Sequence, residues 1–311
     1  TWLDQLCLSG EVAWGRLRAR PGAEEEESRS SAFPSRSTPV SLVVRQDLPW
    51  LLRAVRGDEG PRSPELGATA EVVEALRQRG ALFIGELVQI TGRLPQEVEG
   101  ALWDGVARGL LSADGFGSAR SLLNARWRSR PRALGLRRGA GGFGGEGRWG
   151  LLPEPVQGGD TEELAEALAE QLLVRWGVVF HGLLARENFN LPWREVLWAL
   201  RRMEARGTVR GGRFASGFSG EQYALPEAVE MLRSVRRNPR NGQLVRVAAA
   251  DPLNLVGIVV PGERVSAARN AAVEFLDGLP REGGMVGAGR TEFGPPLLEP
   301  AVDSTPWEPT S

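Results

Sequence analysis

The stretch RGALFIGEL at residues 79–87 decides the fold, because WGVVFHGLL at residues 176–184 repeats its pattern. Three residue pairs recur here at an offset of 97: Gly80 and Gly177, Phe83 and Phe180, Gly85 and Gly182. The match continues through Leu94-Pro95 and Leu191-Pro192, and then, at an offset of 98, through Leu102, Gly109 and Phe116 with Leu200, Gly207 and Phe214. Self-similarity at a fixed offset indicates repeated structural units. The chain therefore contains two copies of one domain.

Both copies predict the same order of elements. A first helix with a 3.6-residue apolar period ends at a glycine, and a third helix begins at a proline, which the first helical turn tolerates. The predicted helices cover 69–79, 84–91 and 95–108 in one copy, and 161–175, 181–187 and 192–206 in the other. The predicted β segments cover 110–113 and 148–152, and then 208–214 and 222–225. Three helices followed by a β-hairpin predict a winged helix-turn-helix domain.

The ends of the chain differ from the two copies. Residues 2–8 resemble the end of a third helix, 11–18 and 40–44 a wing hairpin, and 48–55 a following helix, so we expect a chain cut from a longer protein. Near the other end, strands are predicted at 243–249, 258–260 and 273–276, and Asp277-Gly278 is a two-residue hairpin signal.

The predicted fold class is mainly α with small β (α+β): tandem winged helix-turn-helix domains followed by a small β-barrel-like module. The predicted domains are a truncated winged helix at 1–60 with an acidic, disordered wing loop at 19–38, a winged helix at 61–158 with an Arg/Gly-rich wing insertion at 117–147, a winged helix at 159–240, the β-barrel-like module at 241–282, and a Gly/Pro-rich tail at 283–311.

The composition excludes several kinds of chemistry. All 38 basic residues are arginine, so the phosphate-binding lysine of a P-loop and a lysine Schiff base are both absent. The lone Cys7 excludes a disulfide framework and favours a reducing cytoplasm, and the lone His181 excludes a multi-histidine metal centre. No apolar run approaches the roughly 18 residues of a membrane span, so we expect no membrane contact. We also expect no cofactor in this chain.

The arginines are concentrated in two stretches although the formal net charge is only −1. Concentrated arginine suits phosphate contacts, and the third helix of a winged helix commonly enters the DNA major groove. The candidate DNA-binding residues are Arg194, Arg201 and Arg202 on the 192–206 helix, Arg210 and Arg213 on its wing, and Arg126, Arg128, Arg130 and Arg132 in the insertion. Two alternatives stay open: a GC-rich genome that favours arginine, and a partner-facing role for the helix. The helix at 95–108 is acidic and predicts protein contact instead.

Two aspartates are candidates for catalysis. Asp251 precedes a proline and Asp277 precedes a glycine, so both also fit turn-forming roles. A carboxylate beside a nucleic-acid surface activates water or stabilises the sugar cation of a breaking N-glycosidic bond. Cys7 is best interpreted as a packing residue, and His181 as a capping or packing residue at a helix start.

Three segments of the chain have specific motifs: LCLSGEVAWGRL at 6–17, GGRF at 211–214 continuing to Leu225-Pro226, and ADPLNL at 250–255. With these motifs the chain resembles the C-terminal extension of Lhr, the bacterial large helicase-related protein family. The resemblance implies an ATP-dependent DNA helicase acting in DNA repair in the bacterial cytoplasm, associated with the nucleoid. Its motor domains, with their ATP and Mg, would lie outside this chain.

The same resemblance implies partners and a second activity. The expected partners are DNA, single-stranded or a tailed duplex, and other copies of the chain in a homotetramer. The family's extension is similar to alkylpurine-type DNA glycosylases, and uracil-DNA glycosylase activity with a catalytic aspartate is attached to it. Asp251 is the matching candidate, in a motif that resembles Gln-x-Asp with Ala249 where the glutamine would be. A DNA-binding and assembly module is the preferred function, and a monofunctional glycosylase the alternative.

Overall fold

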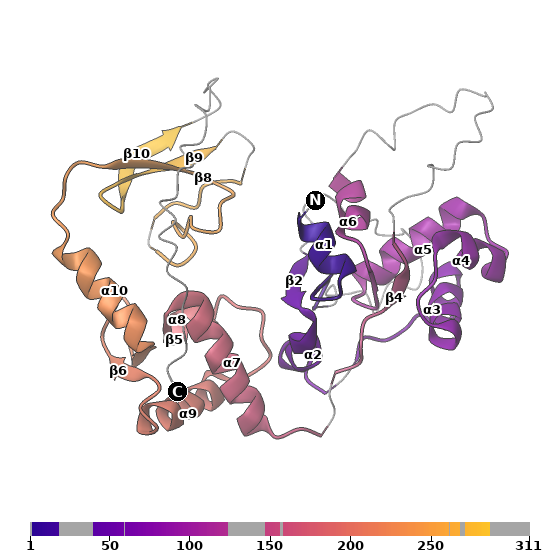
Figure 1. Cartoon of the computed structure of the whole chain (residues 1–311), viewed down its shortest axis with the longest axis horizontal. Helices are drawn as coiled ribbons and strands as arrows, with labels where there is room; N and C mark the ends of the chain where they lie inside the picture. The colour runs from indigo at the N-terminus through magenta and orange to yellow at the C-terminus, as the bar shows by residue number, and fades with distance from the viewer. Residues whose placement is uncertain are drawn as a thin grey trace, which may run out of the picture. The chain divides into compact units, whose positions relative to one another are not determined.

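The computed structural model describes two compact units, 1–233 and 234–311 (Figure 1). The described residues are 2–18, 40–58, 60–123, 147–155, 158–260, 262–267 and 271–286. Unit 1–233 is built from short helices and small antiparallel sheets, and the described part of unit 234–311 contains an antiparallel sheet, which agrees with the predicted mixture of α and β structure. In the described ranges, no helix combines the length and the apolar character that crossing a bilayer would need.

The N-terminal segment, 2–58, forms the predicted helix, hairpin and helix. Its elements are α1 (Trp2–Leu8), β1 (Val12–Gly15), β2 (Ser41–Val44), a 3-10 turn (Arg45–Asp47) and α2 (Leu48–Arg56). The two strands are antiparallel, with Trp14 opposite Leu42. The predicted wing loop at 19–38 lies outside the described residues.

The first copy, 60–155, has the three predicted helices and the hairpin, and a fourth helix lies between the two strands of the hairpin. Its elements are α3 (Ala68–Arg79), α4 (Ile84–Thr91), α5 (Pro95–Ala107), β3 (Leu111–Ala113), α6 (Phe116–Leu123) and β4 (Trp149–Leu151). Strands β3 and β4 pair antiparallel, with Ala113 opposite Trp149. Gly105 allows α5 to approach β3, because a Cβ there would lie 2.4 Å from the Leu111 side chain.

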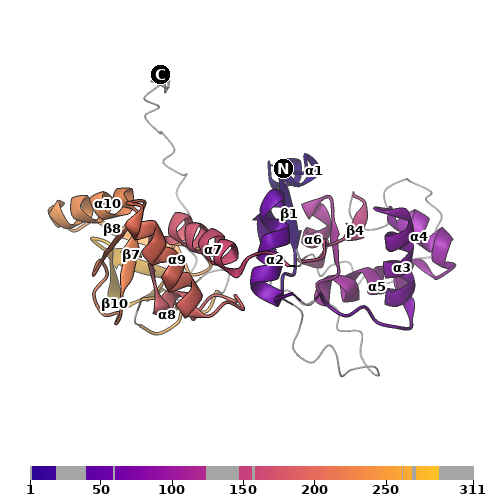
Figure 2. The same cartoon turned by 90° about the horizontal axis from the view of Figure 1, so that it is seen from below.

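The second copy, 158–225, repeats this order and is followed by a further helix. Its elements are α7 (Thr161–Trp176), β5 (Val178–Phe180), α8 (His181–Leu184), α9 (Trp193–Ala205), β6 (Arg210–Gly212) and β7 (Gln222–Ala224), and α10 (Pro226–Arg237) comes next. The sheet order is β5-β7-β6, so the wing hairpin is extended by the strand that precedes α8. Helices α7 and α9 lie side by side (Figure 2).

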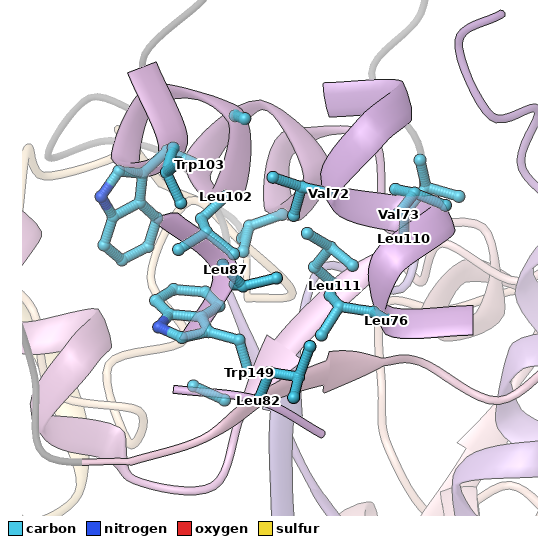
Figure 3. Packing of buried hydrophobic residues seen from close by; sticks show 14 of the residues in the cluster. Val72, Val73, Leu76, Leu82, Leu87, Leu102, Trp103, Leu110, Leu111 and Trp149 are labelled. Carbon is cyan, nitrogen blue, oxygen red and sulfur yellow. The ribbon is translucent and has the colours of Figure 1, made fainter. Parts of the chain in front are cut away.

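One hydrophobic core joins the N-terminal segment to the first copy. Leucines and valines of α3, α4 and α5 pack around Trp103 and Trp149, whose ring centroids lie 5.3 Å apart (Figure 3). Cys7 and Trp14 of the N-terminal segment belong to the same cluster, and the Trp14 ring lies 6.3 Å from that of Trp149. The prediction that Cys7 is a packing residue is confirmed, and burial raises the pKa of its thiol.

The C-terminal unit contains an open antiparallel sheet. Its strands are β8 (Leu244–Ala248), β9 (Ala272–Leu276) and β10 (Leu279–Val286), in the order β10-β9-β8. The predicted hairpin at Asp277-Gly278 joins β9 to β10. Within the described residues of this unit the sheet does not close, so the predicted barrel-like module is not confirmed.

Four details differ from the sequence-based expectations. The predicted strand at 258–260 is wrong: Gly257 has a positive φ of 67°, and the backbone N–H groups of Ile258, Val259 and Val260 all donate to the Leu255 carbonyl, which makes a turn. Strand β10 continues to Val286, into the predicted tail. The predicted 117–147 insertion begins as helix α6, and helix α8 ends at Leu184 instead of residue 187.

Candidate nucleic-acid interface

The outward face of α9 carries arginine and tryptophan. Its inward residues are Val196, Ala199, Leu200 and Met203, all buried. Arg194, Trp198 and Arg201 follow one another at i, i+4 and i+7, a spacing that places them on one helix face. By the same helical angles this face lies opposite the buried one, so the stripe Arg194–Trp198–Arg201 points to solvent. All three residues are exposed.

Arg194 is stacked against Trp198. Its guanidinium carbon lies 5.4 Å from the Trp198 ring centroid, within the range of a cation–π contact. Its Nη2 donates to the Glu195 carboxylate at 3.1 Å, although 71% of the Arg194 side chain stays exposed. A guanidinium in this position keeps N–H groups free to reach a phosphate.

Arg201 ties α9 to the wing. Its Nη2 donates to both carboxylate oxygens of Glu221, at 2.8 and 3.1 Å. The Tyr223 hydroxyl donates to the same carboxylate at 3.1 Å. Hydrogen bonding to Glu221 raises the pKa of Arg201, and hydrogen bonding to Arg201 lowers the pKa of the Glu221 carboxyl. Arg201 is therefore a wing-positioning residue as well as an exposed cation.

Arg202 faces α7. Its guanidinium pairs with Glu162 at 3.4 Å and with Glu166 at 4.0 Å, and Arg206 pairs with Glu166 as well. In the first copy Thr69 and Asp104 occupy the positions that match Glu166 and Arg202, and the Thr69 hydroxyl donates to Asp104 at 2.8 Å. The first and third helices are thus joined by a hydroxyl–carboxylate hydrogen bond in the first copy and by ion pairs in the second. Arg202 therefore has a structural role.

The wing is held in shape by a buried glutamine. The Gln222 side chain, fully buried in β7, accepts from the backbone N–H groups of Phe214 and Ala215, and donates to the Ala215 carbonyl, each at 2.8 Å. Arg210 and Arg213 lie on the exposed side of this wing, and the structure shows no ion-pair partner for either among the described residues. The wing therefore presents two unpaired cations.

The corresponding helix of the first copy offers no such surface. Trp103 and Ala107 of α5, which match Arg201 and Ala205, are buried. Its polar residue Asp104 pairs with Arg108 at 2.8 Å. This helix is thus buried on more than one face within the chain, and its predicted role in protein contact stays a prediction.

His181 is exposed and lies beside α9. The imidazole lies edge-on to the half-buried Trp193 ring, with centroids 5.8 Å apart. Among the described residues no cluster of three or more histidine, cysteine, aspartate or glutamate side chains is arranged to hold a metal ion. The four insertion candidates, Arg126, Arg128, Arg130 and Arg132, lie outside the described residues.

The two candidate aspartates of the C-terminal unit have different surroundings. Asp277 has a positive φ of 49°, and its carboxylate accepts the backbone N–H groups of Asn241, Gly242 and Gln243 at 3.0–3.3 Å. Asp251 is half-exposed, and its Oδ1 accepts one N–H, from Leu253 at 2.9 Å. Asp277 is thus committed to the hairpin backbone, whereas Asp251 keeps an oxygen available.

Comparison with known proteins found a family model that matches the second copy. Residues 158–244 match the model described as large helicase-related protein, winged-helix domain. These residues are therefore similar to the winged-helix domain of the Lhr family. The match covers α9 and its wing, which include Arg194 and Trp198.

Two bacterial proteins are similar to most of the chain. The "Lhr helicase/uracil glycosylase" of Escherichia coli (strain K12) is 28% identical over 287 residues, which are 83% of this chain and 17% of that protein. The "Lhr helicase/ probable uracil glycosylase" of Mycolicibacterium smegmatis (strain ATCC 700084 / mc(2)155) is 29% identical over 279 residues, 82% of this chain and 17% of that protein. The predicted resemblance to Lhr is confirmed, and the chain spans about a sixth of the length of these relatives.

Sequence reasoning did not find the residues that pair with the arginines or hold the wing in shape. Glu221, Glu166 and Gln222 organise the helix and the wing, yet none of them belongs to a recognisable motif. A signal was present for one pair: Arg194 and Trp198 are four residues apart on a predicted helix, which brings side chains together.

Proposed function

We propose that this chain is a DNA-binding part of an Lhr-type ATP-dependent DNA helicase that acts in DNA repair. The observation that carries the proposal is the winged-helix domain whose third helix and wing both expose arginine. Winged helices bind DNA by placing the third helix in a groove and the wing on the backbone. The motor domains, the homotetrameric assembly and the cytoplasmic, nucleoid-associated location that the family resemblance implies are parts of the same proposal.

The wing arginines are the sharpest test of DNA binding. Replacing Arg210 and Arg213 with alanine removes two cations that have no acidic partner in the described structure. We expect weaker binding to all DNA sequences and a salt dependence that is less steep by about two phosphate contacts. Fluorescence anisotropy over a series of salt concentrations measures both.

The double variant Arg77→Ala/Arg79→Ala is the matched control. It removes two exposed arginines from α3 of the first copy and changes the net charge equally. Equal losses of affinity in both double variants would show that DNA affinity depends only on net charge. The wing of the second copy would then not be the DNA-binding site.

A second candidate function is uracil-DNA glycosylase, because both relatives carry that activity in their names. Asp251 is its candidate catalytic residue, since Asp277 is occupied by three backbone N–H groups. Single-stranded DNA with one uracil, incubated with the chain and then treated with alkali, reports base removal. Cleavage that is lost in Asp251→Asn and kept in Asp277→Asn supports this function, and cleavage no higher than in buffer excludes it for this chain.

A further inference from the structure

Among the described tryptophans of the two copies, Trp198 on α9 is the one with an exposed indole. Its side chain is 48% exposed, whereas Trp103 and Trp149 of the first copy are buried and Trp193 is half-buried. A single exposed apolar residue is common on protein surfaces and is not a site by itself. Trp198, however, lies between two arginines on the same face, Arg194 at i−4 and Arg201 at i+3.

The two arginines give this tryptophan a cationic surrounding that suits nucleic acid. Two acids at this surface are each engaged by one of these arginines: Glu195 by Arg194 at 3.1 Å and Glu221 by Arg201 at 2.8 Å. The Arg194 guanidinium already stacks over the ring, and its large exposure leaves it room to move to a phosphate. Proteins that bind single strands combine such cations with an aromatic ring on which a base stacks.

The surface is also held rigid before any ligand binds. The Glu204 carboxylate of α9 accepts the backbone N–H of Gly211 in the wing at 3.0 Å. Together with the Arg201–Glu221 pair, this contact fixes the wing against α9 at two points. A preorganised surface loses less conformational freedom on binding, so stacking on Trp198 is favoured.

We propose that Trp198 is a stacking site for an unpaired nucleobase, with Arg194 and Arg201 beside it to contact the phosphates. The site rests on the proposed DNA-binding function and adds a preference to it. In a duplex the faces of each base are covered by its neighbours, and only the edges are presented in the grooves. A ring that stacks on a base face therefore selects a single strand or an extruded base.

The test compares single-stranded and duplex DNA with the full chain. Fluorescein-labelled oligo-dT and a duplex of the same length are titrated by anisotropy against the wild type, Trp198→Ala and Trp198→Phe. Loss of one stacked base is worth about 1–3 kcal/mol, so we expect Trp198→Ala to weaken single-strand binding about 5- to 160-fold. Duplex affinity should stay within about twofold, and the salt slope should not change, because no charge is removed. Trp198→Phe, which keeps a ring, should retain most of the affinity.

Two controls separate stacking from other effects. Trp2→Ala removes a tryptophan that is 80% exposed on α1 and should leave single-strand affinity unchanged. An oligonucleotide of abasic residues has phosphates but no bases, so wild type and Trp198→Ala should bind it equally. The wild-type chain alone can also be compared on normal and abasic strands. That comparison tests stacking even if Trp198→Ala folds poorly.

Three outcomes would overturn the proposal. They are unchanged single-strand binding by Trp198→Ala, an equal loss for single strand and duplex, and a change in solution mass with no change in DNA affinity. The last result would assign Trp198 to a protein interface. Failure of the underlying function is distinguishable, since the wild type would then bind neither form of DNA.

Discussion

At the scale of single residues, arginines with equal charge have unequal roles. Arg56 of α2 is half-buried, and its guanidinium donates to the backbone carbonyls of Leu17 at 2.5 Å, Gly109 at 2.9 Å and Arg16 at 3.1 Å. Burial lowers the pKa of Arg56 to about 10, so the group stays charged at neutral pH. It joins the N-terminal segment to the turn after α5, which makes it a structural arginine.

Replacing Arg56 with alanine should destabilise the fold. The three carbonyls lose a charged donor, and one lost hydrogen bond to a charged group costs about 2 kcal/mol. Urea unfolding followed by circular dichroism measures the free energy of unfolding. Arg77→Ala, a change of an exposed arginine on α3, should alter it by less than about 0.5 kcal/mol. Equal stability of the two variants would contradict the structural role of Arg56.

At the scale of elements, the wing depends on one side chain from its own return strand. Gln222 lies in β7, and its amide satisfies two backbone N–H groups and one carbonyl in the loop that leaves β6.

The two copies differ at the neighbouring position of the return strand. Trp149 in β4, which pairs with Leu82 as Tyr223 pairs with Val179, packs on Trp103, whereas Tyr223 joins the Arg201–Glu221 pair. The packed Trp103–Trp149 pair of the first copy is thus replaced in the second copy by a hydrogen-bonded group of Arg201, Glu221 and Tyr223.

Gln222→Leu should loosen the wing while leaving the helices in place. The substitution keeps the side-chain volume roughly constant but leaves buried N–H groups without an acceptor, which costs about 2 kcal/mol. Hydrogen exchange should become faster at Phe214 and Ala215, and the melting temperature should fall. Gln78→Leu, on the exposed side of α3, is the control and should change neither. Unaltered exchange in the wing of Gln222→Leu would show that another group holds it.

At the scale of the whole molecule, the N-terminal segment and the first copy behave as one body. Trp14 is buried between them, its Nε1 donates to the Gly115 carbonyl at 3.2 Å, and Phe116 of α6 packs edge-on against its ring at 6.2 Å. The third part of the same unit is attached through α2, whose Ala54 carbonyl accepts the Asn190 N–H at 2.6 Å. The C-terminal unit forms its own sheet.

Trp14→Ala should therefore destabilise α3 and α5 as well as α1. Truncation of a buried aromatic side chain costs about 3–5 kcal/mol, and here that cost falls on a shared core. Hydrogen exchange read by mass spectrometry should show lower protection in both segments, while β8 and β9 keep theirs because they belong to the other unit. Loss of protection confined to α1 and β1 would mean that the two segments unfold independently.

Much of the helical framework could be predicted from the sequence because its signals are local. Helix α4 has the predicted bounds, and α3 and α7 end at Gly80 and Gly177 as expected. The strand prediction at 258–260 was wrong because β-branched residues favour extended backbone locally, whether or not a partner strand is present. In the described residues the segment instead folds on the Leu255 carbonyl.

The sequence by itself determined the repeated order of helices and wing strands, the absence of lysine chemistry and the resemblance to Lhr. These follow from periodicity, turn residues and composition, all of which act within short stretches. Only the tertiary structure decided which arginines are available. Arg201 pairs with Glu221 twenty residues away, Arg202 pairs with Glu166 on another helix, and Arg194 stacks on Trp198. Arg210 and Arg213 have no ion-pair partner among the described residues. The charge of an arginine is a property of the residue itself, whereas its ion-pair partner is set by the packing of residues that are distant in the sequence.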